Sequence, residues 1–182
     1  MHMWYVIQVI KGCEDAMASL IGRVVPQTVL AECFSPKFAT EIKLRGQWTP
    51  CAKNLFPGYL IAVTDSPVEL ESRLAQLHEF AHVLMQGESY APLAPEDMEI
   101  IGAFTRPGER VIPMSMGVKD GERVMVTEGP LVGHEGKIRS IDRHKSTAVV
   151  EFDLCGRFVT ARMGLGLVTA DERVMEDIRA HA

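Results

Sequence analysis

The sequence predicts an α+β domain followed by a small β-barrel, and two patterns carry that prediction. In roughly the first hundred residues, strand-like apolar runs alternate with runs of helical spacing, as in helices packed on an antiparallel sheet. Beyond residue 118 the apolar runs are short and glycines separate several of them, which is typical of a small barrel. We therefore expect a first domain at residues 1–104, a linker at 105–118, a barrel at 119–170 and a short C-terminal helix at 171–182.

The first domain is predicted to begin with a buried strand over residues 3–9, which are mainly β-branched and aromatic. Apolar residues then recur at helical spacing between residues 17 and 24, and Pro26 ends that run. Alternation of apolar with charged residues over 38–44 predicts a half-buried strand with one wet face. A further strand is expected at residues 59–63.

Proline marks the start of two more helices. Ser66 and Glu69 have the spacing of a capping box around Pro67, so a helix is expected to begin there. Pro95 opens a third predicted helix, and residues 83–85 form a short strand before it. The expected order is strand, helix, strand, strand, helix, strand, helix, which describes helices packed against an antiparallel sheet.

The second part of the chain has a different character. Residues 105–118 contain prolines and glycines without clear periodicity, so a flexible tether is expected there. Short strands are expected next, at residues 124–127, 137–141, 147–152, 157–161 and 165–168. Thr169 and Glu172 form another capping box, which predicts the C-terminal helix.

Composition excludes several classes of function. The hydrophobic content of 47% is too high for a disordered chain, and no apolar run approaches the ~20 residues that span a bilayer. No signal-peptide pattern is evident, so a cytoplasmic protein is expected. The cysteines are widely spaced and the histidines lack metal spacing, so neither a metal nor a cofactor is expected. We find no nucleophile–base pair and no phosphate-binding glycine loop, so an enzyme is not expected.

The net charge of −5 is unevenly distributed. Residues 1–104 carry 7 Lys and Arg against 12 Asp and Glu, whereas residues 119–170 carry 8 against 7. An acidic first domain suits a protein partner better than a nucleic acid. Any contact with nucleic acid must therefore come from a local basic face.

Two motifs, in this order, resemble one protein family. Residues 53–62 read Lys-Asn-Leu-Phe-Pro-Gly-Tyr-Leu-Ile-Ala, and they follow a Met-Trp-Tyr-Val strand at residues 3–6. Residues 121–138 carry Gly-Pro and further glycines at spacings that permit the tight bends of a small barrel. Over about residues 3–169 the chain resembles the NusG family of transcription elongation factors. The resemblance implies an N-terminal NGN domain and a C-terminal, SH3-like KOW barrel.

The resemblance implies RNA polymerase as the partner of the NGN domain. In the family, an apolar patch on that domain meets the clamp helices of the largest polymerase subunit, and aromatic residues around the Phe-Pro-Gly-Tyr segment help to form it. By position, the polymerase-binding candidates here are Tyr5, Phe56, Tyr59, Trp4 and Leu55. The alternative is that these are core residues, because strand alternation turns only one of Trp4 and Tyr5 inward.

The KOW barrel is expected to engage RNA or a protein. Housekeeping members recruit ribosomal protein S10 or the terminator Rho, but Leu131 and residues 154–157 depart from the family pattern at the corresponding positions. Basic side chains on the barrel can neutralise the phosphates of a nascent RNA hairpin. The candidates are Lys137, Arg139, Arg143, His144, Lys145 and Arg157, and Arg162 lies on the same barrel. The alternative is a solvated face balanced by neighbouring carboxylates.

These departures favour a specialised paralogue, such as the LoaP-like or RfaH-like antitermination factors. Such a protein binds RNA polymerase and promotes processive elongation at selected operons. Two alternatives stay open. One is a housekeeping NusG that couples polymerase to the ribosome or to Rho. The other is a KOW-type RNA-binding or ribosome-associated protein without polymerase contact.

Overall fold

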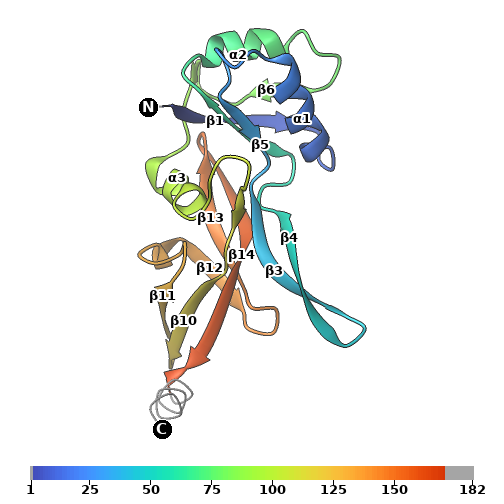
Figure 1. Ribbon diagram of the computed structural model, residues 1–182. Helices are drawn as coiled ribbons and strands as arrows, with labels where there is room; N and C mark the ends of the chain where they lie inside the picture. The colour runs from blue at the N-terminus through green and yellow to red at the C-terminus, as the bar shows by residue number, and fades with distance from the viewer. Residues whose placement is uncertain (1, 171–182) are drawn as a thin grey trace.

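The structure, a computed structural model, describes residues 2–170 (Figure 1). The molecule is elongated, with helices α1 (Glu14–Val24) and α2 (Pro67–Leu74) at one end and the strands of the second half running toward the other. The C-terminal helix expected at 171–182 lies outside the described residues. Within residues 2–170, no helix has the length and apolar character needed to cross a membrane.

The first half of the chain builds a four-stranded antiparallel sheet in the order β2-β5-β1-β6. Its strands are β1 (Met3–Val9), β2 (Glu32–Phe34), β5 (Tyr59–Thr64) and β6 (Ala81–Val83). Both faces of the sheet are covered, which is why β1 and β5 read as continuous apolar runs. Because strand side chains alternate, Tyr5 packs with the cluster beneath α1 and α2, whereas Val6 belongs to the cluster on the opposite face.

Strands β3 (Lys37–Leu44) and β4 (Gln47–Asn54) form a hairpin that projects away from α1 and α2 (Figure 1). Its turn residues Arg45 and Gly46 have φ angles of 50° and 84°, the positive values that match the twist of a hairpin. The sequence does not reveal β4, because Pro50 lies in its middle. Proline is tolerated there since β4 is the edge strand of the sheet β4-β3-β9.

The stretch 105–118 holds one short strand and the first part of another. β9 (Val111–Ile112) pairs in parallel with β3, and β10 (Ser115–Asp120) pairs with two strands of the second half. The backbone N–H of Lys37 donates to the carbonyl of Arg110 at 2.9 Å. The stretch therefore differs from the flexible tether that its composition suggests, because its backbone groups bond to strands on both sides.

The second half forms a five-stranded sheet in the order β11-β10-β14-β13-β12. Beside β10 its elements are β11 (Arg123–Glu128), the 3-10 helix η1 (Glu135–Lys137), β12 (Ile138–Asp142), β13 (Thr147–Leu154) and β14 (Arg157–Thr169). The strands expected at 157–161 and 165–168 are one continuous strand. Gly164 and Gly166 lie within this strand. At each of them a neighbouring segment comes close to the backbone, and glycine leaves room for it.

Helix α3 (Pro95–Gly102) lies between the two halves (Figure 1). A small hairpin of β7 (Met85–Gln86) and β8 (Ser89–Tyr90) precedes it. Ile100 and Ile101 of α3 are fully buried. The observed helices and strands confirm the predicted α+β class with its second, all-strand barrel.

One hydrophobic core runs through both halves of the molecule. It contains Phe38 and Phe56 from the first half, and Val150 and Phe152 from β13. The rings of Phe56 and Phe152 meet edge to face, with centroids 4.9 Å apart and planes at 84°. The two halves are therefore joined by side-chain packing as well as by the chain itself.

Candidate functional site

The Phe56–Tyr59 segment is a tight turn at the entry to β5. The N–H of Tyr59 donates to the carbonyl of Phe56 at 3.0 Å, and Gly58 has a φ of 88°. Proline at the second position and a left-handed glycine at the third are the features of a type II turn. A residue with a Cβ would be strained at position 58, so the sequence of this motif follows from its backbone shape.

Glu14 at the start of α1 holds this turn in place. Its carboxylate accepts a hydrogen bond from the N–H of Gly58 at 2.7 Å and another from the N–H of Gly12 at 2.9 Å. The side chain is buried. Burial raises the pKa of the Glu14 carboxyl, but backbone N–H groups and nearby Lys37 outweigh it, and the pKa lies below its usual range. Glu14 therefore stays ionised and connects two loops.

The candidate polymerase-binding residues fall on two faces of the first sheet. Leu55 and Phe56 are buried in the core shared with the barrel, and Trp4 and Tyr59 are half-buried against it. Tyr5 is on the opposite face, in the cluster beneath α1 and α2. The structure thus brings four of the five candidates together and separates Tyr5 from them.

The guanidinium of Arg110 packs on two aromatic rings of this face. The rings of Trp4 and Phe34 pack edge to face, with their centroids 5.4 Å apart. The guanidinium of Arg110 lies 5.1 Å from the Trp4 ring centroid and 4.6 Å from that of Phe34. Arg110 is also ion-paired with Glu32 of β2. The stretch after α3 is thereby fastened to the aromatic face of the first sheet.

An acidic helix and a basic turn form the polar contact between the halves. Asp97 of α3 is completely buried, and its carboxylate accepts from Lys137 Nζ at 2.8 Å and from the N–H of Asp153 at 3.0 Å. Glu96 lies 3.6 Å from the same lysine. Burial lowers the pKa of Lys137, but the hydrogen bonds and charges of Asp97 and Glu96 raise it by more, so the pKa lies above its usual value. The buried carboxylate therefore has a charged partner from the barrel.

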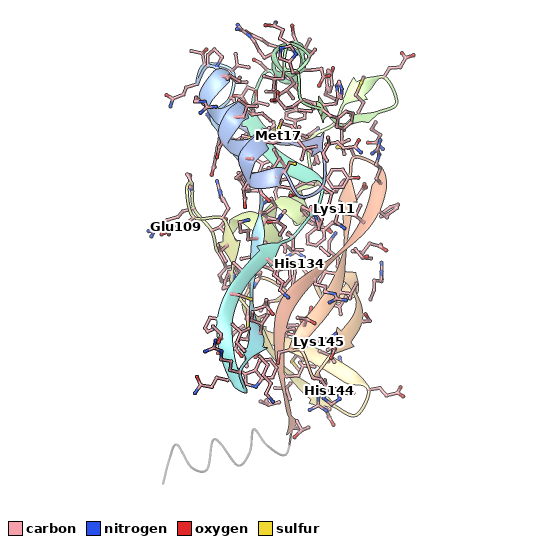
Figure 2. All side chains as sticks on the ribbon, turned by 90° about the vertical axis from the view of Figure 1, so that its right-hand side faces the viewer. Lys11, Met17, Glu109, His134, His144 and Lys145 are labelled. Carbon is pink, nitrogen blue, oxygen red and sulfur yellow. The ribbon has the colours of Figure 1, made fainter. Side chains whose placement is uncertain are left out.

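Two further polar contacts join the halves beside the Asp97–Lys137 pair. His134 Nε2 lies 3.7 Å from a carboxylate oxygen of Glu99, and Figure 2 labels His134 at the level where the halves meet. The Sγ of Cys155, in the turn between β13 and β14, donates to the carbonyl of Ala91 at 3.2 Å. Burial, followed by the charge of Asp153, raises the pKa of the Cys155 thiol. This turn is therefore covered by the first half of the molecule.

The candidate RNA-binding residues occupy three separate places. Lys137 and Arg157 lie where the halves meet, with Arg157 reaching Gln8 at 3.5 Å. Arg139 pairs with Glu151 at 2.8 Å on the barrel. Arg143, His144 and Lys145 are exposed in the turn between β12 and β13, and Figure 2 shows the last two at the end of the barrel far from α1. They do not gather on one face.

Sequence reasoning missed the partners that join the halves, Asp97 and Phe152. Asp97 looks like an ordinary acidic residue in a first helical turn, a position that favours carboxylates for local reasons. Alternation in residues 147–154 predicts that Phe152 is buried, but not which part of the chain buries it. Among residues 2–170 no group of three His, Cys, Asp or Glu side chains could hold a metal ion.

Comparison with known proteins agrees with this architecture. The family described as transcription termination factor nusG matches residues 2–102, and the KOW motif matches residues 121–151. A transcription termination/antitermination protein NusG of Campylobacter jejuni is 25% identical over 162 residues, covering 86% of this chain and 90% of the relative. Its counterpart in Bacillus subtilis is 28% identical over 162 residues, covering 85% of this chain and 90% of the relative.

A solved structure described as domain interaction in Thermotoga maritima NusG has the same fold. It matches with a TM-score of 0.50 at 17% identity, over 90% of this chain and 94% of that one. The nusG match alone spans more than half of the residues. With both parts of the architecture accounted for in the same order, the chain belongs to the NusG family of transcription factors.

Proposed function

We propose that this protein binds RNA polymerase through the aromatic face around Phe56 and promotes processive elongation and antitermination at selected operons. The observation that carries the proposal is the turn at residues 56–59, fixed by Glu14 and flanked by the apolar face of the first sheet. Apolar faces with aromatic anchors suit the docking of helices, here the clamp helices of the largest polymerase subunit. Family members are not enzymes and work with RNA polymerase, and the relatives are named as termination/antitermination proteins.

The proposed face is closed in this structure. Phe56 is 3% exposed because Phe152 of the barrel packs on it, so a polymerase helix can reach it only after the barrel moves away. Opening exposes apolar surface and separates Lys137 from Asp97. We therefore take the closed form as a resting state whose equilibrium with an open form sets the affinity for polymerase.

One observation favours a housekeeping role as the second candidate. Phe158 at the start of β14 is 71% exposed, beside the turn at residues 155–156. An exposed aromatic on a barrel edge suits a protein partner. Ribosomal protein S10 or Rho would be that partner in a protein that couples polymerase to the ribosome or to termination.

Capture of core RNA polymerase by the full-length chain tests the main proposal. Lys137→Glu places a carboxylate beside buried Asp97, which disfavours the closed form by about 3 kcal/mol and shifts the equilibrium about a hundredfold. We expect stronger capture by Lys137→Glu. Adding Phe56→Ala and Tyr59→Ala to that variant should abolish the gain, because the exposed face then lacks its aromatic anchors.

Arg139→Glu is the matched control, since it reverses a charge on the same barrel but its partner Glu151 is also on the barrel. It should capture polymerase like the unaltered protein. Unchanged capture by Lys137→Glu, with amide spectra that show a released barrel, would contradict the closed resting state. Equal capture with and without the two aromatic substitutions would contradict the assignment of the face.

A further inference from the structure

A groove lies between the β3–β4 hairpin of the first half and strands β13 and β14 of the barrel. Its volume is about 330 Å³. We call it the hairpin–barrel groove, and its lining residues are Phe38, Thr40, Glu41, Ile42, Lys43, Trp48, Lys53, Lys145, Thr147 and Arg162. Each half of the molecule supplies one wall, so the groove exists as a unit only in the closed form.

The strands that carry the two walls, β3 and β14, come close to each other at residues near the lining residues in sequence. A Cβ added to Gly164 of β14 would lie 2.7 Å from the carbonyl oxygen of Ala39 on β3 and 2.4 Å from Met114 Cγ, so β14 has no room for a side chain there. Buried Phe38, Thr40 and Thr147 line the groove nearby. In the closed form this close approach of β3 and β14 sets the separation of the walls.

The rim of the groove is strongly positive. Lys43 and Lys53 come from the hairpin and Lys145 and Arg162 from the barrel, against one lining carboxylate, Glu41. In residues 2–170, Lys43, Lys53 and Arg162 form no ion pair, and all three are exposed. Lys145 has only an exposed contact with Asp142 at 3.6 Å. This charge is therefore available to a ligand, unlike that of Lys137 and Arg139.

An aromatic ring accompanies these charges. Trp48 is 55% exposed and lies directly opposite Lys43 in the register of the hairpin. Among residues 2–170 the indole has no contact with another aromatic ring, and about half of its side chain can be reached by a planar group. A groove with basic walls and an exposed aromatic is the arrangement by which proteins hold single strands, with phosphates on the cations and a base stacked on the ring.

We propose that the hairpin–barrel groove binds a single-stranded nucleic acid. Lys53 and Arg162 contact backbone phosphates from opposite walls, and Trp48 stacks on a base. A duplex is excluded from the stacking contact, because its bases are already stacked on each other. Binding in this groove uses the closed form, in which both walls are present, and it is measured on the free protein without polymerase, so its test can fail separately from that of the proposed function.

Fluorescence anisotropy with the full-length protein tests the proposal. The probes are an oligouridylate and an oligothymidylate of about 12 nucleotides, a length suited to one such groove, and a duplex of equal length. We expect both single strands to bind and their affinity to fall steeply with salt. A preference for one of them identifies RNA or DNA as the source of the strand.

Two variants examine the walls and the ring. Lys53→Ala with Arg162→Ala should lower the slope of log affinity against log salt by about 1.4, near 0.7 for each phosphate of a single strand that is no longer neutralised. Trp48→Ala should weaken single-strand binding about tenfold while leaving the salt slope unchanged. The matched control is Lys11→Ala with Arg23→Ala, which removes the same charge from exposed sites outside the groove and should bind like the unaltered protein.

Several results would overturn the proposal. Absence of single-strand binding at low salt is one, and an equal loss in the control pair is another, since it would show a general charge effect. Equal affinity for duplex, with no change in Trp48→Ala, would replace the stacked strand by simple attraction to phosphates. Displacement by oligoglutamate at concentrations matching the oligonucleotides would show a site for acidic protein instead.

Discussion

A single carboxylate, that of Glu14, determines the local geometry of the motif by which this chain is recognised. The carboxylate is buried and accepts hydrogen bonds from the N–H groups of Gly12 and Gly58. No uncharged side chain of this length offers two acceptor oxygens without a donor. Removal of one of these bonds leaves a backbone N–H unsatisfied beneath the Phe56–Tyr59 turn. The residue thus links the start of α1 to the proposed polymerase-binding face.

We expect Glu14→Gln to lower the free energy of unfolding by about 2 kcal/mol, because it removes bonds from buried N–H groups to a charged acceptor. Urea unfolding at neutral pH measures this. Asp15→Asn is the control, since it removes a charge from the same helical turn but from an exposed side chain. Similar decreases in both variants would mean that only the helix dipole is involved.

The same residue predicts a pH dependence. Because the folded pKa of Glu14 is depressed, its contribution is fully present above the ordinary glutamate value of 4.5 and disappears as pH falls through the lower folded value. Acid should therefore reduce the stability of the unaltered protein more than that of Glu14→Gln. Parallel pH profiles for the two proteins would show that Glu14 does not titrate in this way.

At the scale of elements, β14 and β3 approach each other closely at Gly164, where a side chain would not fit. A Cβ at Gly164 would lie 2.4 Å from Met114 Cγ and 2.7 Å from the backbone oxygen of Ala39. At Gly166 the nearest atoms are 2.8 and 2.9 Å away, but they are the flexible end of Met116. The two glycines therefore differ in what a methyl group would meet.

Gly164→Ala should destabilise the protein by about 1 to 3 kcal/mol, because backbone cannot yield as a side chain does. Gly166→Ala should change stability little, since Met116 can rotate away and alanine reduces the freedom of the unfolded chain. Thermal unfolding of the two variants compares them directly. The opposite order would mean that the contact between β3 and β14 adapts easily.

Much of the element order is predictable from residues that act locally. Period-two and helical spacing, Pro67, Pro95 and the Phe56–Tyr59 turn locate most of the first sheet and its helices. β4 is not predictable in this way, because Pro50 argues against a strand unless its edge position is known. The stretch 105–118 has the composition of a loose segment, and its pairing with the distant strands β3 and β14 cannot be read from local residues.

At the scale of the whole molecule, the shared core predicts that the two halves unfold as one cooperative unit. Phe152 is fully buried against Phe56, so Phe152→Ala should cost about 3 to 5 kcal/mol. We expect the unaltered chain to unfold in one calorimetric transition and Phe152→Ala in two, because the halves no longer support each other. Phe158→Ala on the same barrel, exposed in the structure, should keep the single transition.

The placement of the site is less predictable than the fold. Phe56, Leu55, Trp4 and Tyr59 share a face, as the motif suggests, but their covering by β13 depends on which apolar surfaces of the two halves meet. The surroundings of the basic side chains are equally hard to predict. Lys137 and Arg139 pair with carboxylates from other elements, whereas Arg162 and Lys145 line the hairpin–barrel groove. Charge counted along a chain cannot distinguish these cases, since pairing is decided in space.

The core shared by the two halves also limits how this chain can exchange parts with its relatives. If a barrel grafted from another member had a smaller or larger residue in place of Phe152, Phe56 would face a cavity or a steric clash. Such a hybrid would lose the proposed closed resting state even if each half were intact. The residues at positions 56 and 152 therefore depend on each other, so that a change of size on one side of the contact calls for a compensating change on the other.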